Sequence, residues 1–329
     1  MPFRSSHLAF FAATLAPLAV ACGDDKRPAT TTISSSPATV AIVDSGSTPA
    51  ISDTAPRTPP PVSYADAAAA YAGRHYAEAV NLFAAYTRSS PENAWGHYML
   101  ALSSWKAGDP EQAIAGFDEA LRLDPQHRKS LLNSARVLLE TSRPREALER
   151  IERAMSLEPL SAEGLRLLGR VRYELKQVPE AIEAYRQAIV LDERDGWAMN
   201  NLGLIYLQQD RSDAALPILA RAVELRSNSP VFQNNFGTAL ERTGRFAAAK
   251  QAYEAALAAD STYGKAAASL ARVSPHAESD TAIVDLAALA TEFQAEVERW
   301  RDSTVESDSV ESDSTVNTDS IVESDSTAE

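Results

Sequence analysis

The side chains best suited to covalent or metal chemistry are one cysteine, Cys22, and the histidines that follow it. These histidines are far apart in sequence and show no metal-ligand spacing: His75, His97, His127 and His276. No glycine-rich phosphate loop and no nucleophile elbow occurs. The sequence therefore predicts a protein that is not an enzyme, with no catalytic residue, no metal site and no cofactor.

Three other groups of side chains have the chemistry of a binding surface. Aromatic and apolar residues form a strip at three- and four-residue spacing: Trp95, Tyr98, Leu102 and Trp105. Cations are grouped in an otherwise acidic chain: Lys129, Arg136, Arg166 and Arg170. Amides recur at multiples of one fixed interval: Asn133, Asn201 and Asn235. Cations can pair with carboxylates, and an amide can donate and accept hydrogen bonds at once.

These groups can share a surface only if the elements that carry them repeat, and the sequence does repeat, with a period of about 34 residues. Three columns of small residues have this period: Ala79, Ala113, Ala147, Ala181, Ala215 and Ala249; Ala101, Ala135, Gly169, Gly203 and Gly237; Ala120, Ala154, Ala188, Ala222 and Ala256. Small residues where helices cross, with large ones between them, are the signature of a two-helix solenoid.

The repeated unit resembles the tetratricopeptide repeat. The family motif W-x2-L-G-x2-Y, A-x3-F, P is met in part by Leu202, Gly203, Tyr206 and Ala215, and one repeat later by Phe236, Gly237, Ala249 and Tyr253. The resemblance covers residues 63–273 and implies an all-α, right-handed solenoid that acts as a protein-binding scaffold. We expect repeats at 60–93, 94–127, 128–161, 162–195, 196–229 and 230–263, then a partial unit at 264–273 that Ser274-Pro275 ends.

In such a solenoid the first helix of each pair lines a concave groove, and the three groups fall on that side. We therefore expect the groove to bind a protein or an extended peptide, and the cations favour an acidic one. The resemblance implies that the Asn column holds a peptide backbone, although Asn is also common there where nothing binds. Two further alternatives stay open. The aromatic strip packs on the first repeat, or the cations pair with Glu140, Glu163 or Glu174.

Residues 1–21 have the pattern of a secretory signal peptide. Leu8 to Ala21 are uncharged and apolar, but fall short of the roughly 20 residues that a bilayer requires. Leu18-Ala19-Val20-Ala21 before Cys22 resembles a bacterial lipoprotein cleavage box, with Ala19 where Leu is usual. We expect a lipidated Cys22 that anchors the protein in the cell envelope, facing the periplasm. Gly23 favours the outer membrane by resemblance to sorting signals, and an ordinary secretory signal is the alternative.

The segments on either side of the repeats differ from them in composition. Residues 22–62 are rich in Ser, Thr and Pro and predict a disordered tether. An apolar stripe predicts a capping helix at 281–301, with a coiled-coil dimer seam as the alternative: Ile283, Leu286, Ala290, Phe293, Val297 and Trp300. Residues 302–329 lack Lys and Arg and predict a disordered acidic tail, which either solubilises the protein or docks on the groove cations.

The net charge of −14 argues against a nucleic-acid partner. Together these features predict a membrane-tethered scaffold or adaptor that binds a protein or peptide. By resemblance, lipoproteins of this build include pilotins of type IV pili and adaptors for cell-wall hydrolases. The alternative is a structural subunit of a secretion or polysaccharide-export complex, held by its convex face. The sequence leaves the oligomeric state open.

Overall fold

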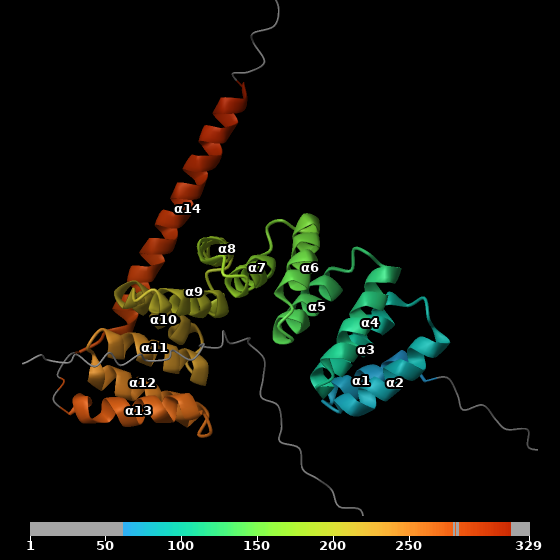
Figure 1. The fold of residues 1–329 in the computed structure, drawn as a ribbon, viewed down its shortest axis with the longest axis horizontal. Coiled ribbons are helices and arrows are strands. Elements are labelled where there is room, and N and C mark those ends of the chain that lie inside the picture. Colours follow the sequence, from blue (N-terminus) through green and yellow to red (C-terminus); the bar gives the residue numbers. More distant parts are fainter. Residues whose placement is uncertain (1–61, 279, 281–282, 317–329) are drawn as a thin grey trace, which may run out of the picture. The chain divides into compact units, whose positions relative to one another are not determined.

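The computed structural model describes residues 62–278, 280 and 283–316, and all regular structure in these ranges is helical (Figure 1). The signal peptide, Cys22 and nearly all of the expected tether lie outside them. The helices are α1 (Tyr64–Ala72), α2 (Tyr76–Ser89), α3 (Ala94–Ala107), α4 (Pro110–Leu123), α5 (Arg128–Glu140), α6 (Pro144–Leu157), α7 (Ala162–Glu174), α8 (Val178–Leu191), α9 (Gly196–Gln208), α10 (Ser212–Leu225), α11 (Pro230–Arg242), α12 (Phe246–Ala259), α13 (Gly264–Ala277) and α14 (Leu286–Val316).

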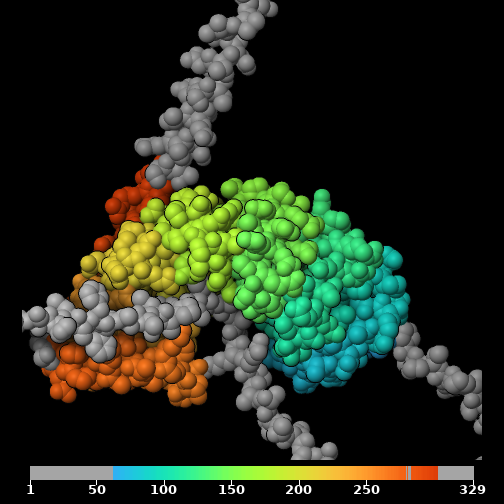
Figure 2. Space-filling view, in the orientation of Figure 1, coloured from blue at the N-terminus to red at the C-terminus, as the bar shows by residue number. Residues whose placement is uncertain are grey.

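The described helices form two compact units, one built on residues 62–198 together with 296–316 and the other on residues 199–295, so that the division falls within α9 and within α14. From α1 to α7 each helix packs against the next, and the space-filling view shows no gap between them (Figure 2). The first helices of successive pairs also touch, as α1 with α3, α3 with α5 and α5 with α7. The second unit repeats this arrangement in α10 to α13, where α11 touches α13. The all-α solenoid predicted from the sequence is confirmed.

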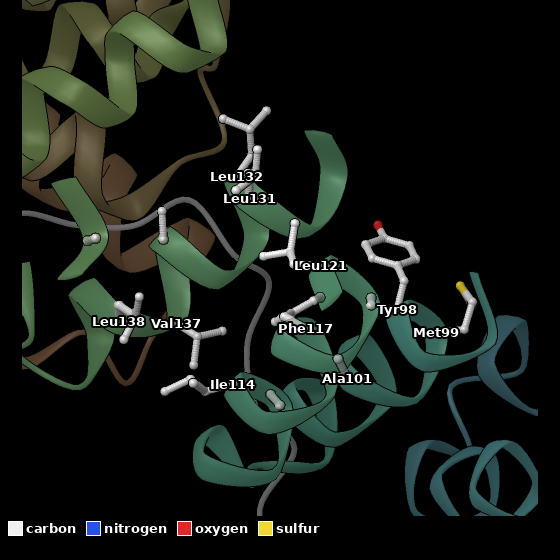
Figure 3. Packing of buried hydrophobic residues seen from close by; sticks show 14 of the residues in the cluster. Tyr98, Met99, Ala101, Ile114, Phe117, Leu121, Leu131, Leu132, Val137 and Leu138 are labelled. Atoms are coloured by element: carbon white, nitrogen blue, oxygen red, sulfur yellow. The ribbon is translucent and has the colours of Figure 1, made fainter. Parts of the chain in front are cut away.

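Columns of small and large residues hold each helix pair together. The alanines of the column from Ala79 to Ala249, one in each repeat, are each 0% exposed. The large residues one helical turn after them are also fully buried: Phe83, Phe117, Ile151, Tyr185, Leu219 and Tyr253. Figure 3 shows this packing around Phe117 and Ala101. Fully burying one such side chain contributes about 1.5–3 kcal/mol, so the columns carry much of the stability.

One residue in each turn between paired helices has a left-handed backbone. These residues recur at the repeat interval: Arg74, Gly108, Ser142, Lys176, Asp210 and Gly244. Gly108 and Gly244 adopt φ values of 91° and 78° without strain, because they have no Cβ. The next backbone N–H then bonds back across the turn, as from Asp109 to the Ser104 carbonyl at 2.9 Å. This is the Schellman closure, and it ends each first helix at the same place.

Two helix ends differ from the sequence expectation. Helix α13 continues past Ser274-Pro275 to Ala277. Pro275 removes one backbone donor only in the last turn, and Ser274 Oγ donates to the Leu270 carbonyl at 2.7 Å. Helix α14 begins at Leu286 rather than 281 and runs to Val316, into the segment expected to be a disordered tail. No Gly or Pro follows Pro275, so a helix nucleated by its buried start can propagate.

The start of α14 is anchored by Ala290, Phe293 and Val297, which are buried. Ile283, expected in the same stripe, precedes the helix and is 96% exposed. Trp300 lies under the Arg186 guanidinium at 4.9 Å, and Arg301 pairs with Glu193. Among the described residues, no helix is long and apolar enough to span a bilayer.

Candidate functional site

An aromatic cluster of Tyr64, Trp95, Tyr98 and His127 lies at the first helices of the N-terminal unit. The ring centroids of Trp95, Tyr98 and His127 are 5.0–5.2 Å apart. Trp95 Nε1 donates a 2.6 Å hydrogen bond to the Tyr64 hydroxyl, which links the cluster to the first repeat. Trp95 nevertheless remains 40% exposed. The cluster therefore presents a large, fixed aromatic surface to the outside.

Tyr98 forms the buried base of the aromatic cluster. It is 6% exposed and lies 5.9 Å from Phe117, centroid to centroid. Burial raises the pKa of Tyr98, and the 3.1 Å hydrogen bond donated by Asn133 Nδ2 opposes this shift. Burial lowers the pKa of His127, so the imidazole is neutral at pH 7. Lys129 Nζ lies 5.1 Å from the Trp95 ring and places an exposed cation beside the cluster.

The other two members of the aromatic strip pack against the core. Leu102 and Trp105 are half-buried against it. Trp105 Nε1 donates to Glu140 Oε2 at 2.8 Å, and Lys106 lies over the ring at 4.8 Å. The sequence analysis offered Glu140 as an ion-pair partner for the groove cations. It instead accepts a hydrogen bond from the Trp105 indole.

Two of the arginines predicted to line the groove are ion-paired across repeats. Arg136 on α5 pairs with Glu163 at the start of α7 and donates to Asn133 Oδ1 at 2.6 Å. Arg166 on α7 pairs with Asp195 at 2.8 Å. The Asp195 carboxylate also accepts from the backbone N–H of Ala198 at 3.0 Å, so it caps the first turn of α9. These ion pairs fix one first helix to the next.

Arg170 differs from these two arginines. It is 8% exposed, and its Nε and Nη1 are buried with no hydrogen-bond acceptor. Burial lowers the pKa of its guanidinium, while electrostatic interactions with Tyr185 and then with Glu174 oppose this shift. The sequence left open that Arg170 pairs with Glu163 or Glu174. Glu163 pairs with Arg136 instead, and Glu174 forms no ion pair with Arg170. Arg170 is therefore a buried cation with unfilled donors.

The Asn column is divided between the two units and bonds internally. Asn133 lies in the first unit, bonded to Tyr98 and Arg136. Asn201 and Asn235 lie in the second unit and are buried. Asn235 Nδ2 donates to Asn200 Oδ1 at 2.8 Å, and Asn200 Nδ2 approaches Asn201 Oδ1 at 3.4 Å. The amides therefore form a ladder within the second unit, whereas the aromatic cluster and the cations belong to the first.

Sequence reasoning missed several members of these groups. His127 lies at the N-cap of α5, where its Nδ1 accepts from the Ser130 backbone N–H at 3.2 Å. Tyr64 lies at the start of α1, outside the aromatic strip identified from the sequence. Asn200 and Asn234 each directly precede an Asn of the predicted column. These two consecutive Asn-Asn pairs are the sequence feature that could have identified them. In the part of the chain that the structure describes, no three His, Cys, Asp or Glu residues are grouped to hold a metal ion.

Comparison with known proteins gives consistent matches along the repeats. Family models described as "Tetratricopeptide repeat" match residues 64–128, 104–171, 198–229 and 232–263, and one described as "TPR repeat" matches 169–210. No curated protein matches the chain in sequence.

Two solved structures are similar in fold. A chain of the APC/C hetero-tetramer Cut9-Hcn1 aligns at 20% identity and a TM-score of 0.57, covering 64% of this chain. This chain spans only 41% of that one. PilF from Pseudomonas aeruginosa aligns at 20% identity and a TM-score of 0.51, covering 67% of this chain and 97% of PilF. At this identity the likeness concerns the fold alone.

Proposed function

We propose that this chain, which belongs to the tetratricopeptide repeat family, is a membrane-tethered adaptor that binds a segment of a protein partner along its first helices. The family fold is an interaction scaffold, and the stacked first helices provide a continuous surface within each unit. The tether is a lipid on Cys22. Its support is the sequence of the cleavage box.

The observation that carries the proposal is the exposure of Trp95 within a fixed ring cluster. Tyr64, Tyr98 and His127 hold the indole through ring contacts and one hydrogen bond. A partner therefore gains apolar contact without the entropy loss of ordering the side chain, as at binding hot spots. The neighbouring Lys129 cation favours a partner segment that carries acidic residues near the apolar contact.

A pull-down from detergent-solubilised membranes tests this proposal. Wild-type protein is compared with Trp95→Ala and with Leu160→Ala, each followed by mass spectrometry of the bound proteins. Leu160 is the matched control, because it is 77% exposed but lies in the turn before α7 rather than on a first helix. We expect Trp95→Ala to weaken the partner at least about tenfold and Leu160→Ala to retain it.

The same experiment separates the proposal from its alternative. A partner kept equally by all three proteins would contradict binding at the aromatic cluster and would favour a structural subunit held by its convex face. The identity of the captured protein then distinguishes a pilotin-like role from a hydrolase adaptor.

A further inference from the structure

Three exposed leucines lie at the turns between repeats in the first unit. Leu157 and Leu191 end α6 and α8 at equivalent positions and are 42% and 43% exposed, and Leu160, in the turn before α7, is 77% exposed. We call these three residues the leucine patch. At the position of Leu160 the other repeats have polar residues: Glu92, Gln126, Arg194, Asn228 and Thr262. The repeat fold therefore does not require an apolar side chain there.

The chain enters the solenoid at the same edge as the leucine patch. Helices joined by such short turns run antiparallel, so each first helix runs away from this edge and each second helix returns to it. The ends of α6 and α8 and the start of α7 thus lie at the edge where α1 starts. Ser63 caps α1, since its Oγ accepts from the Asp66 backbone N–H at 3.1 Å. The residues before Val62 therefore leave from the edge that carries the patch.

The segment that precedes the repeats contains one apolar run, Val40-Ala41-Ile42-Val43. The run holds three of the five large apolar residues between 23 and 61, and the other two, Ile33 and Ile51, stand alone. Residues 28–43 contain no Asp, Glu, Lys or Arg. This stretch is therefore both neutral and locally apolar.

The charges beside the leucine patch are already neutralised in pairs. These pairs are Arg128 with Glu158, Arg166 with Asp195 and Arg301 with Glu193. A neutral apolar segment covers such a surface without separating an ion pair, whereas a charged segment would have to compete with one.

The run can reach the patch. Residues 44–61 link it to α1, and a chain of this length spans up to about 60 Å. Helix α7 is three contacts from α1, through α3 and α5, and neighbouring helices lie about 8–10 Å apart. Because both partners belong to one chain, their effective concentration is in the millimolar range, so a small apolar contact is sufficient for binding.

We propose that the leucine patch binds the run Val40-Ala41-Ile42-Val43 of the same chain, so that the tether folds back on the first unit. Binding removes the apolar surface of both from water. With Cys22 anchored, docking leaves residues 23–39 free and shortens the root-mean-square span of the tether from about 31–37 Å to about 21–25 Å. The docked chain holds the repeats closer to the membrane than the released chain. Docking itself depends neither on the lipid nor on Trp95.

Photo-crosslinking of the full-length protein in lipid nanodiscs tests the proposal. Leucines are replaced by photo-leucine, a diazirine analogue that keeps a branched apolar side chain, and cross-linked peptides are identified by mass spectrometry. We expect the leucine patch to cross-link to the peptide that contains Val40-Ala41-Ile42-Val43. Absence of this product overturns the proposal.

Substitutions in the run provide the first comparison. We expect the triple variant Val40→Ser, Ile42→Ser, Val43→Ser to give at least about tenfold fewer of these cross-links, because its apolar surface is removed. The matched control changes Thr30, Thr31 and Thr32 to Ser and should keep them. Equal losses in the two variants would contradict recognition of the run.

A substitution in the patch provides the second comparison. Leu160→Ser should reduce the cross-links from Leu157 and Leu191, because the most exposed part of the patch is lost. Its melting temperature should stay at the wild-type value, since polar residues occupy this position in the other repeats. Gln126→Ser, in the equivalent turn one repeat earlier, should leave the cross-links unchanged.

Other occupants of the patch give different products. Cross-links that join isotopically light and heavy chains in a mixed sample would overturn the proposal in favour of a second copy. Cross-links from Leu160 to lipid would overturn it in favour of the membrane surface. An unlipidated protein would give the same docking in buffer but would remove its effect on membrane distance. Partner capture that depends on Trp95 is independent of all these results.

Discussion

At the scale of single residues, Gly237 shows how closely two helices approach. A Cβ built on Gly237 would lie 2.7 Å from Tyr253 Cε1, nearer than carbon atoms approach in folded proteins. We expect Gly237→Ala to destabilise the protein by about 1–3 kcal/mol, because the buried Tyr253 ring has no space to move. Urea denaturation measures this loss.

Gly264→Ala provides the control for this prediction. A Cβ at Gly264, the first residue of α13, meets nothing within 4 Å. We expect its effect to stay within about 1 kcal/mol. Equal losses in the two variants would mean that helix propensity, and not the Tyr253 contact, explains the glycine at 237.

Tyr253 also predicts how stability depends on alkaline pH. Burial, with hydrogen bonding of its hydroxyl to Glu241, raises the pKa of Tyr253 to about 12 from an ordinary value of 10.0. A raised tyrosine pKa contributes stability that is complete below pH 10 and is lost as pH rises through 12. We therefore expect Tyr253→Phe to lose less stability than wild type between pH 8 and pH 11, measured by urea denaturation. Equal losses would show that folding does not raise the pKa of Tyr253.

At the candidate site, the sequence did not predict which side chains are exposed and which are paired. The spacing of Trp95 and Tyr98 identified a first-helix surface, but spacing does not distinguish an exposed ring from the buried one beneath it. The cations were identified by charge alone. Ion pairing of Arg136 and Arg166 depends on the residue that the next repeat provides, which is a property of packing between repeats. His127 was missed because it precedes its helix.

At the scale of elements, α14 predicts a contribution to stability that does not require a second chain. Phe293 is 1% exposed on the early part of this helix. We expect Phe293→Ala to cost about 3–5 kcal/mol in urea denaturation, because the loss of a buried ring leaves a cavity. Gln294→Ala, at the exposed neighbouring position, should change stability by less than about 0.5 kcal/mol.

Protein concentration separates a capping helix from a dimer seam. If Phe293 packs within one chain, the urea midpoint of wild type is independent of protein concentration. A midpoint that rises with concentration would contradict the cap and would support the coiled coil considered from the sequence.

Elements were predicted better than sites because their signal is repeated. A small residue and a large residue must meet wherever two helices cross, and the Ala79 and Phe83 columns record this requirement in every repeat. The ends of α13 and α14 carry no such repetition. Pro275 was read as a stop, but a proline in a last turn removes only one hydrogen bond.

At the scale of the whole molecule, the proposed lipid anchor on Cys22 predicts where the protein is found in the cell. We expect wild-type protein in the membrane fraction, with an acylated N-terminal cysteine by mass spectrometry. Cys22→Ser should move the protein to the soluble fraction, because lipidation at that position is removed. An unmodified wild-type N-terminus would contradict the lipoprotein assignment and favour a secreted scaffold, without changing the predicted role of Trp95.

The left-handed residue in each turn has a consequence for how such a chain changes length. From Arg74 to Gly244 these residues recur at a constant interval, with the same left-handed backbone at each. A block cut from one such residue to the next therefore begins and ends in matching conformations. Unequal recombination between repeats can add or delete whole blocks without creating a new loop. The reach of the solenoid is thus a quantity that evolution or an engineer can adjust in fixed steps.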